Sequence, residues 1–193
     1  MDITGLTGHS GSGKTTVAKI MAEHGFHHID CDKVVHHKVY KNALVLNEIA
    51  DAFGSEYVLN GELQRKALGA LVFSDKQAYA NLMEIVQKHV TVQIDKEIKE
   101  NSDKHILLDA PALFEYGIQG ICSRIIGVVS DNAVERICAR DGISEVQAKN
   151  RLNNQKDYSF YKENCDILIE NNCSIEELEN KVINIAKQIL KGQ

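Results

Sequence analysis

Residues able to bind phosphate stand together near the beginning of the chain. Positions 8–15 read Gly-His-Ser-Gly-Ser-Gly-Lys-Thr and fill every required place of the pattern G-x-x-x-x-G-K-[ST]. In this pattern the glycines let backbone N–H groups approach phosphate oxygens, the lysine neutralises their charge, and the final hydroxyl can ligate Mg²⁺. We therefore expect a nucleoside triphosphate to bind here. The candidate contact residues are Gly8, Ser10, Gly11, Ser12, Gly13, Lys14, Thr15 and Thr16.

Carboxylates follow two predicted strands, where a phosphoryl-transfer enzyme needs them. Asp30 and Asp32 come after the apolar run 26–29, and Asp109 ends the run 106–108. The carboxyl ends of neighbouring parallel strands open into one crevice, so these groups should face the phosphate loop. Asp32 is the better candidate for a general base on an attacking hydroxyl, and Asp109 for a Mg²⁺ ligand, directly or through water. Capping of turns and strand ends is the alternative, and for Asp30 the two readings stay open.

A basic segment follows the fourth predicted strand of an otherwise acidic chain. It contains Arg136, Arg140, Lys149, Arg151, Lys156 and Lys162. Solvated helix faces often have this composition. A lid that closes over the γ-phosphate would have it too, because the planar donors of arginine match phosphate oxygens. Arg140 is the leading candidate for that contact.

The order of apolar runs predicts an α/β fold with a doubly wound parallel sheet. Five short runs have the continuous apolar character of buried parallel strands. They are residues 3–6, 26–29, 106–108, 125–129 and 167–169. A helix is expected from about Lys14 to Gly25, and capping boxes at Ser144 and Ser174 mark two further helix starts. Residues 44–100 show no convincing strand and predict a helical insertion, a natural place for a second substrate.

Composition excludes several classes of function. The net charge of −5 gives no reason to expect nucleic acid, and no apolar run reaches the length of a membrane span. The five cysteines are scattered and fit reduced thiols in a cytoplasmic protein. Histidines cluster around Cys31, but the segment changes from helix to strand to loop, so we do not expect a zinc or iron site there.

Several segments together resemble the dephospho-CoA kinase family, essentially from end to end. The phosphate loop is common to many proteins, whereas the Asp-x-Asp-x₃-His and Pro-x-Leu-Phe-Glu segments and the Arg-Asp-Gly to Gln155 spacing are more particular. These segments are 6–18, 29–36, 111–115, 140–155 and 165–171. The resemblance implies a P-loop kinase with a five-stranded parallel core, a helical substrate domain and a lid. The implied boundaries are 1–43, 101–135 and 164–193 for the nucleotide-binding core, 44–100 for the acceptor domain, and 136–163 for the lid.

The same resemblance implies roles for individual residues. Asp32 would be the general base, Lys14 and Arg140 would oppose the charge of the transferred group, and Asn171 would lie near the adenine of ATP. The implied acceptor side consists of Asp32, His36, Arg65, His89, Asp109 and Leu113. Thr15 would ligate Mg²⁺, and Asp109 would bind it directly or through water.

The expected reaction is the Mg²⁺-dependent transfer of the ATP γ-phosphoryl group to the 3′-hydroxyl of dephospho-CoA, which ends coenzyme A biosynthesis. We expect a cytoplasmic monomer or weak homo-oligomer with a small-molecule acceptor. Two alternatives remain: a related nucleoside or nucleotide kinase with a different acceptor pocket, and an ATP-binding switch protein without turnover.

Overall fold

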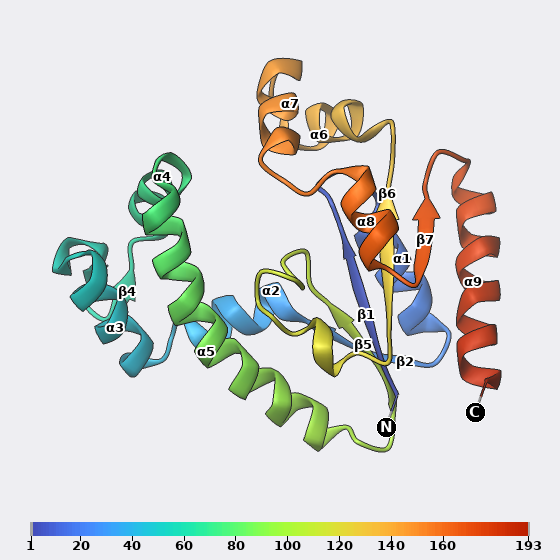
Figure 1. Cartoon of the computed structure of the whole chain (residues 1–193), viewed down its shortest axis with the longest axis horizontal. Coiled ribbons are helices and arrows are strands. Elements are labelled where there is room, and N and C mark those ends of the chain that lie inside the picture. The colour runs from blue at the N-terminus through green and yellow to red at the C-terminus, as the bar shows by residue number, and fades with distance from the viewer. Residues whose placement is uncertain (1, 193) are drawn as a thin grey trace. The chain divides into compact units, whose positions relative to one another are not determined.

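Five parallel strands form the central sheet of the protein. The computed structural model describes residues 2–192, without the side chain of Phe73. The strand order is β2-β5-β1-β6-β7, so the first strand lies between two strands that come more than a hundred residues later (Figure 1). The strands are β1 (Ile3–Gly8), β2 (Phe26–Asp30), β5 (His105–Asp109), β6 (Arg124–Val129) and β7 (Ile167–Glu170). All five predicted strands and the doubly wound fold class are confirmed.

The parallel register brings the carboxyl ends of β1, β5 and β6 to the same end of the sheet. In the β1–β5 pair Leu6 lies opposite Asp109, and in the β1–β6 pair Gly8 lies opposite Val128. The phosphate loop therefore leaves β1 at the edge where β5 ends with its carboxylate. This is the arrangement that ligand sites of open α/β sheets use.

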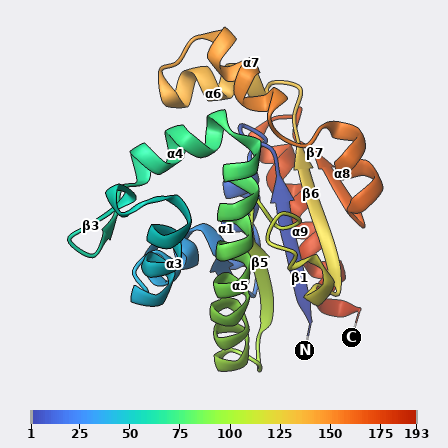
Figure 2. The same cartoon turned by 60° about the vertical axis from the view of Figure 1, so that its left-hand side comes forward.

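Apolar side chains from both ends of the chain form the core of this sheet. Helices α1 (Lys14–Glu23) and α9 (Ile175–Lys191) cover one face and contact each other (Figures 1 and 2). Their buried residues, such as Met21 and Val182, pack on Leu107 and Ile126 from the strands. Because both faces of the central strands are covered, their sequences read as continuous apolar runs.

Three helices and a single helical turn complete this part of the molecule. They are α6 (Ala133–Asp141), α7 (Glu145–Asn153), α8 (Tyr158–Asn164) and the 3₁₀ turn η3 (Gln119–Ile121). The predicted capping boxes are both present: Ser144 and Gln147 begin α7, and Ser174 and Glu177 begin α9. Helix α8 lies against β6, where the sulfur of Cys165 occupies the space above Gly127. Residues 136–163, which the sequence predicts to be a lid, thus contain most of α6 together with α7 and α8, and the last two begin with side-chain caps at Ser144 and Asp157.

The chain divides into two compact units. The sheet unit comprises Met1–His28, Asn101–Leu113 and Gln119–Gln193, and the helical unit comprises Ile29–Glu100 and Phe114–Ile118. Inside the helical unit, α3 and α4 both pack against the long helix α5 (Figures 1 and 2). Its elements are α2 (Cys31–Val34), the π-helical turn η1 (Val35–Val39), α3 (Ala43–Phe53), the 3₁₀ turn η2 (Ser55–Tyr57), β3 (Val58–Leu59), β4 (Glu62–Leu63), α4 (Arg65–Ser74) and α5 (Lys76–Glu100).

The expectation of no strand between residues 44 and 100 is wrong. Strands β3 and β4 pair antiparallel around Asn60 and Gly61, whose φ angles are 53° and 74°. Two consecutive positive φ angles make the tight turn that matches the twist of a hairpin, and Asn-Gly is its preferred sequence. Each strand has only two residues, too few to show an alternating pattern, so the Asn-Gly pair was the one available signal.

No helix in residues 2–192 combines the length and apolar character that a membrane span needs.

Candidate active site

The phosphate loop depends on glycine at two positions. Gly11 has a φ of 75° and Gly13 a φ of 92°, both in the left-handed region that other residues avoid. Space is also lacking, since a Cβ at Gly11 would lie 2.5 Å from the carbonyl oxygen of Ala133. A Cβ at Gly13 would lie 2.2 Å from Nδ2 of Asn171. The loop can keep this conformation only with glycine at both places, and α1 begins directly after it at Lys14.

Two side chains brace the phosphate loop: Asn171, directly after β7, and Arg136 of α6. The amide of Asn171 donates to the backbone oxygen of Ser12 at 2.8 Å, and Arg136 donates to the backbone oxygen of Asn171 at 3.0 Å. Asn171 is only 4% exposed. The hydroxyl of Ser12 is fully buried and has no hydrogen-bond partner within the described residues. A buried hydroxyl without a hydrogen bond costs free energy. The Ser12 hydroxyl therefore fits a loop in which a bound ligand supplies the missing hydrogen-bond partner.

Three side chains from neighbouring elements meet at the end of β5. The ammonium of Lys14 forms an ion pair with Oδ1 of Asp109, and Nε2–H of His28 donates to Oδ2 at 3.0 Å. Exposure of the side chains is 14% for Lys14, 7% for Asp109 and 28% for His28. The structure thus brings together the predicted Lys14 and Asp109. It adds His28, which the sequence analysis did not single out because its partner lies 81 positions away.

Residues of the segment predicted to be a lid, 136–163, contact the phosphate loop at Ser10. The guanidinium of Arg140 donates to the hydroxyl of Ser10 at 3.3 Å, and the backbone N–H of Ser10 donates to the side-chain oxygen of Gln155 at 2.8 Å. Arg140 and Arg151 both pair with the exposed carboxylate of Asp141. Hydrogen bonds from Arg140 and Arg151 hold the pKa of Asp141 well below its usual range. Arg140 is therefore within hydrogen-bond distance of the phosphate loop, and the carboxylate of Asp141 orients its guanidinium.

The helical unit contains four of the predicted residues, Asp32, His36, Arg65 and His89. Arg65 donates to Nε2 of His36 at 2.9 Å, so the proton of this imidazole is on Nδ1, a buried atom without a partner within the described residues. Burial, followed by the charge of Arg65, lowers the pKa of His36, and the carboxylate of Asp32 opposes that shift. Burial, with a smaller effect of Asp32, also raises the pKa of Tyr116. Asp32 is exposed, and its charge raises the pKa of His36, Tyr40 and Tyr116 against or along with the larger effect of burial.

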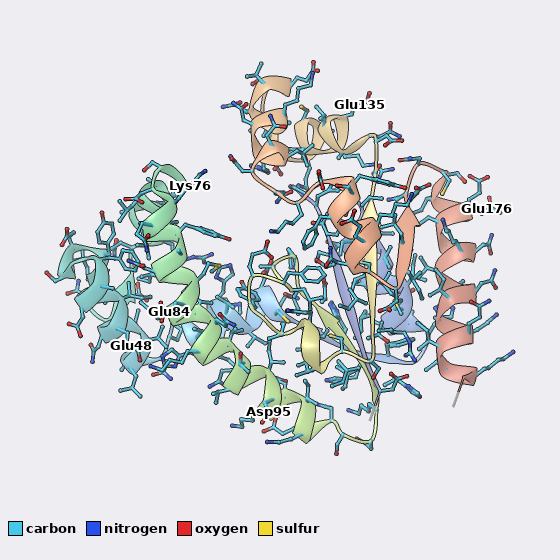
Figure 3. All side chains as sticks on the ribbon, in the orientation of Figure 1. Glu48, Lys76, Glu84, Asp95, Glu135 and Glu176 are labelled. Atoms are coloured by element: carbon cyan, nitrogen blue, oxygen red, sulfur yellow. The ribbon has the colours of Figure 1, made fainter. Side chains whose placement is uncertain are left out.

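His89, expected on the acceptor side, is paired inside the helical unit. Its Nε2–H donates to Glu48 at 2.9 Å, and Lys88 reaches the same carboxylate at 3.3 Å. Glu48 is labelled on α3 in Figure 3, so these contacts join α3 to α5. The pairing lowers the pKa of Glu48, chiefly through the hydrogen bond from His89.

The remaining predicted residues differ in accessibility. Thr15 is exposed in the first turn of α1 and Thr16 is half-buried beside it, whereas Gly8 is buried at the end of β1. Leu113 is fully buried and lies close to Gly5, so it has no surface to offer a ligand directly. Within residues 2–192, no three His, Cys, Asp or Glu side chains gather as a metal-binding group.

Known proteins of one family match this chain over nearly its whole length. The sequence model of the dephospho-CoA kinase family matches residues 2–177. A dephospho-CoA kinase of Fusobacterium nucleatum is 38% identical over 184 residues, which are 93% of this chain and 94% of that protein. The structure of a dephospho-CoA kinase from Campylobacter jejuni superposes with a TM-score of 0.72 at 27% identity and covers 98% of both chains. A crystal structure from Thermus thermophilus gives a TM-score of 0.81 at 28% identity and covers 97% of both chains.

Proposed function

The chain belongs to the dephospho-CoA kinase family and is an ATP-dependent phosphotransferase, and from this premise we propose how its own residues share the transfer. The γ-phosphoryl group of ATP passes to the 3′-hydroxyl of the dephospho-CoA ribose. The observation that carries the proposal is a phosphate loop locked by glycines, with Lys14 held at its exit by a buried carboxylate. Such a loop has the charge and the backbone shape to receive a triphosphate.

The loop binds the phosphates of ATP through backbone and side-chain donors. N–H groups at Gly11, Gly13 and the start of α1 surround the oxygens, and the helix start adds partial positive charge. The buried hydroxyl of Ser12 gains the partner it lacks. Lys14 leaves Asp109 for the phosphates, where its charge opposes the negative charge that develops during transfer.

The residues near Lys14 fit Mg²⁺ as the accompanying ion. Mg²⁺ prefers oxygen ligands and keeps several waters, so it needs few protein groups. Here the hydroxyl of Thr15 and the carboxylate of Asp109 would hold it, directly or through water. Such an ion would neutralise part of the negative charge of the phosphates.

Arg140 and Asp32 complete the proposed machinery. Arg140 already contacts Ser10. When its guanidinium moves from the carboxylate of Asp141 to the γ-phosphate, it exchanges one negatively charged partner for another. Asp32 accepts the proton of the ribose hydroxyl as the new P–O bond forms and the bond to ADP breaks. A closed lid keeps water from competing as the acceptor.

The helical unit supplies the acceptor contacts in this proposal. Arg65 offers its charge to the phosphates of dephospho-CoA, and Nε2 of His36, 2.9 Å away, accepts a hydrogen bond from its guanidinium and orients it. His89 acts by holding α3 to α5 through Glu48. We also place the enzyme in the cytoplasm, where reducing conditions suit its five cysteines, as a monomer or weak homo-oligomer.

The test is release of ADP from Mg·ATP with dephospho-CoA, adenosine, AMP or no acceptor. Turnover that requires dephospho-CoA and yields CoA supports the proposal. Turnover with adenosine or AMP instead would favour the related nucleoside or nucleotide kinase. ATP binding without turnover on any acceptor would favour the switch protein.

A further inference from the structure

Asp109 changes its surroundings when nucleotide binds, according to the roles proposed above. Its carboxylate is almost fully buried, and among residues 2–192 its side-chain partners are Lys14 on one oxygen and His28 on the other. An ionised carboxylate removed from water needs hydrogen-bond donors or opposite charges around it. Lys14 provides the charge in the structure described here, but the phosphates of ATP need the same ammonium.

The nucleotide phosphates compete with Asp109 for Lys14, but they do not compete for His28. It lies in β2, and β2 is the neighbour of β5 in the sheet, so a rigid element holds the imidazole beside Oδ2. The ring can donate from Nε2 without carrying a charge, and its position in β2 is independent of α1 and the loop. When Lys14 moves, the hydrogen bond from His28 can stay.

We propose that His28 is a positioning residue that keeps Asp109 hydrogen-bonded while Lys14 moves from that carboxylate to the nucleotide phosphates. The inference rests on the proposed functions of Lys14 and Asp109. It extends them to a residue that does not touch the substrate and acts through the carboxylate.

The consequence is a change in nucleotide affinity with a defined sign. Without His28, Asp109 depends on Lys14 alone, so Lys14 is held more strongly before ATP binds. After binding, the carboxylate would be left without either recorded partner beside a negatively charged triphosphate. Both effects weaken ATP binding, and both exist before any Mg²⁺ is added.

Equilibrium binding of ATP in EDTA measures this directly, by calorimetry or with a fluorescent ATP analogue. His28→Leu should raise the Kd of Mg²⁺-free ATP about tenfold, which corresponds to ~1.4 kcal/mol. His28→Gln keeps an N–H donor and should remain within about threefold of the parent protein. His27→Leu is the matched control, because His27 is the preceding residue of the same strand and is half-buried like His28. Its Kd should change less than about twofold.

A double-mutant cycle separates positioning from general damage to the fold. In an Asp109→Asn background the buried negative charge is gone, so His28→Leu should change the Kd of ATP less than about twofold. An equal loss in both backgrounds would overturn the inference, as would an unchanged Kd for His28→Leu in the parent protein. If His28→Leu fails to fold, His28→Ala, which also removes the donor, replaces it in both backgrounds, with the same expected result and the same overturning result.

The binding measurement contains no acceptor. A protein that fails to phosphorylate dephospho-CoA could therefore still show the coupling between His28 and Asp109, and a working kinase could lack it. The two proposals fail separately.

Discussion

Replacing Gly13 by alanine should damage the phosphate loop by an amount that can be worked out from the structure. A left-handed backbone costs a residue with a Cβ about 1–2 kcal/mol. The new methyl group would lie 2.2 Å from Nδ2 of Asn171, so the amide must move and lose its hydrogen bond to Ser12, about 1 kcal/mol more. The sum is about 2–3 kcal/mol, which lowers the melting temperature of a chain this size by roughly 5–10 °C.

Thermal unfolding by circular dichroism measures the stability, and calorimetry measures ATP binding. We expect Gly13→Ala to weaken ATP binding about tenfold or more, because the displaced loop no longer points its N–H groups at one position. Gly61→Ala is the matched control. Gly61 also has a positive φ, 74°, but nothing lies within 4 Å of its ideal Cβ position. It should show the backbone cost alone, with unchanged ATP binding.

A second substitution tests whether the contact with Asn171 causes the loss of stability. In an Asn171→Ala background the obstructing amide is absent, so Gly13→Ala should cost only the backbone strain of about 1–2 kcal/mol. If Gly13→Ala costs the same in both backgrounds, the contact with Asn171 does not explain the effect. If Gly13→Ala leaves both melting temperature and affinity unchanged, the described loop conformation is not the one that matters.

Three further outcomes are expected. Lys14→Ala should lower kcat by at least about 10²-fold, because a charge opposing the transferred group is lost; Lys19→Ala, exposed on the same helix, should not change it. Asp32→Asn should lower kcat about 10²-fold while ATP and acceptor still bind, as measured by calorimetry; weaker binding at normal kcat would make Asp32 a positioning group. Burial raises the pKa of Cys122 to about 12. At pH 8.5 iodoacetamide should therefore label the exposed Cys173 first, as followed by peptide mass spectrometry, and the reverse order would contradict that burial.

The sheet could be predicted from the sequence because its signals are local. Each strand is a short apolar run, and each run alternates with a helix that carries its own start or stop signal, such as Ser144 or Gly25. The phosphate loop is equally local, since strand, glycines and lysine are contiguous. The hairpin at residues 58–63 could not be predicted from periodicity, because its strands have two residues each. Its one local signal is the turn sequence Asn60-Gly61.

The partners within the site could not be predicted in the same way. His28 meets Asp109 and Asn171 meets Ser12 only after strands far apart in the sequence have paired. No spacing rule links such residues. The π-helical turn at Val35–Val39, which carries His36, also has no composition signal of its own. Sequence reasoning therefore identifies groups able to do chemistry, and the fold decides which of them share a site.

The brace between Asn171 and Ser12 also limits when the protein can begin to function during its synthesis. The two residues are 159 positions apart, and β1 waits for β5 and β6 before it has neighbours in the sheet. Pairing between segments so far apart slows folding and lengthens the exposure of apolar strands. Nascent chains that end before residue 171 would carry the complete phosphate-binding sequence and still lack the support that shapes it. Competence to hold ATP would then report that synthesis has passed residue 171.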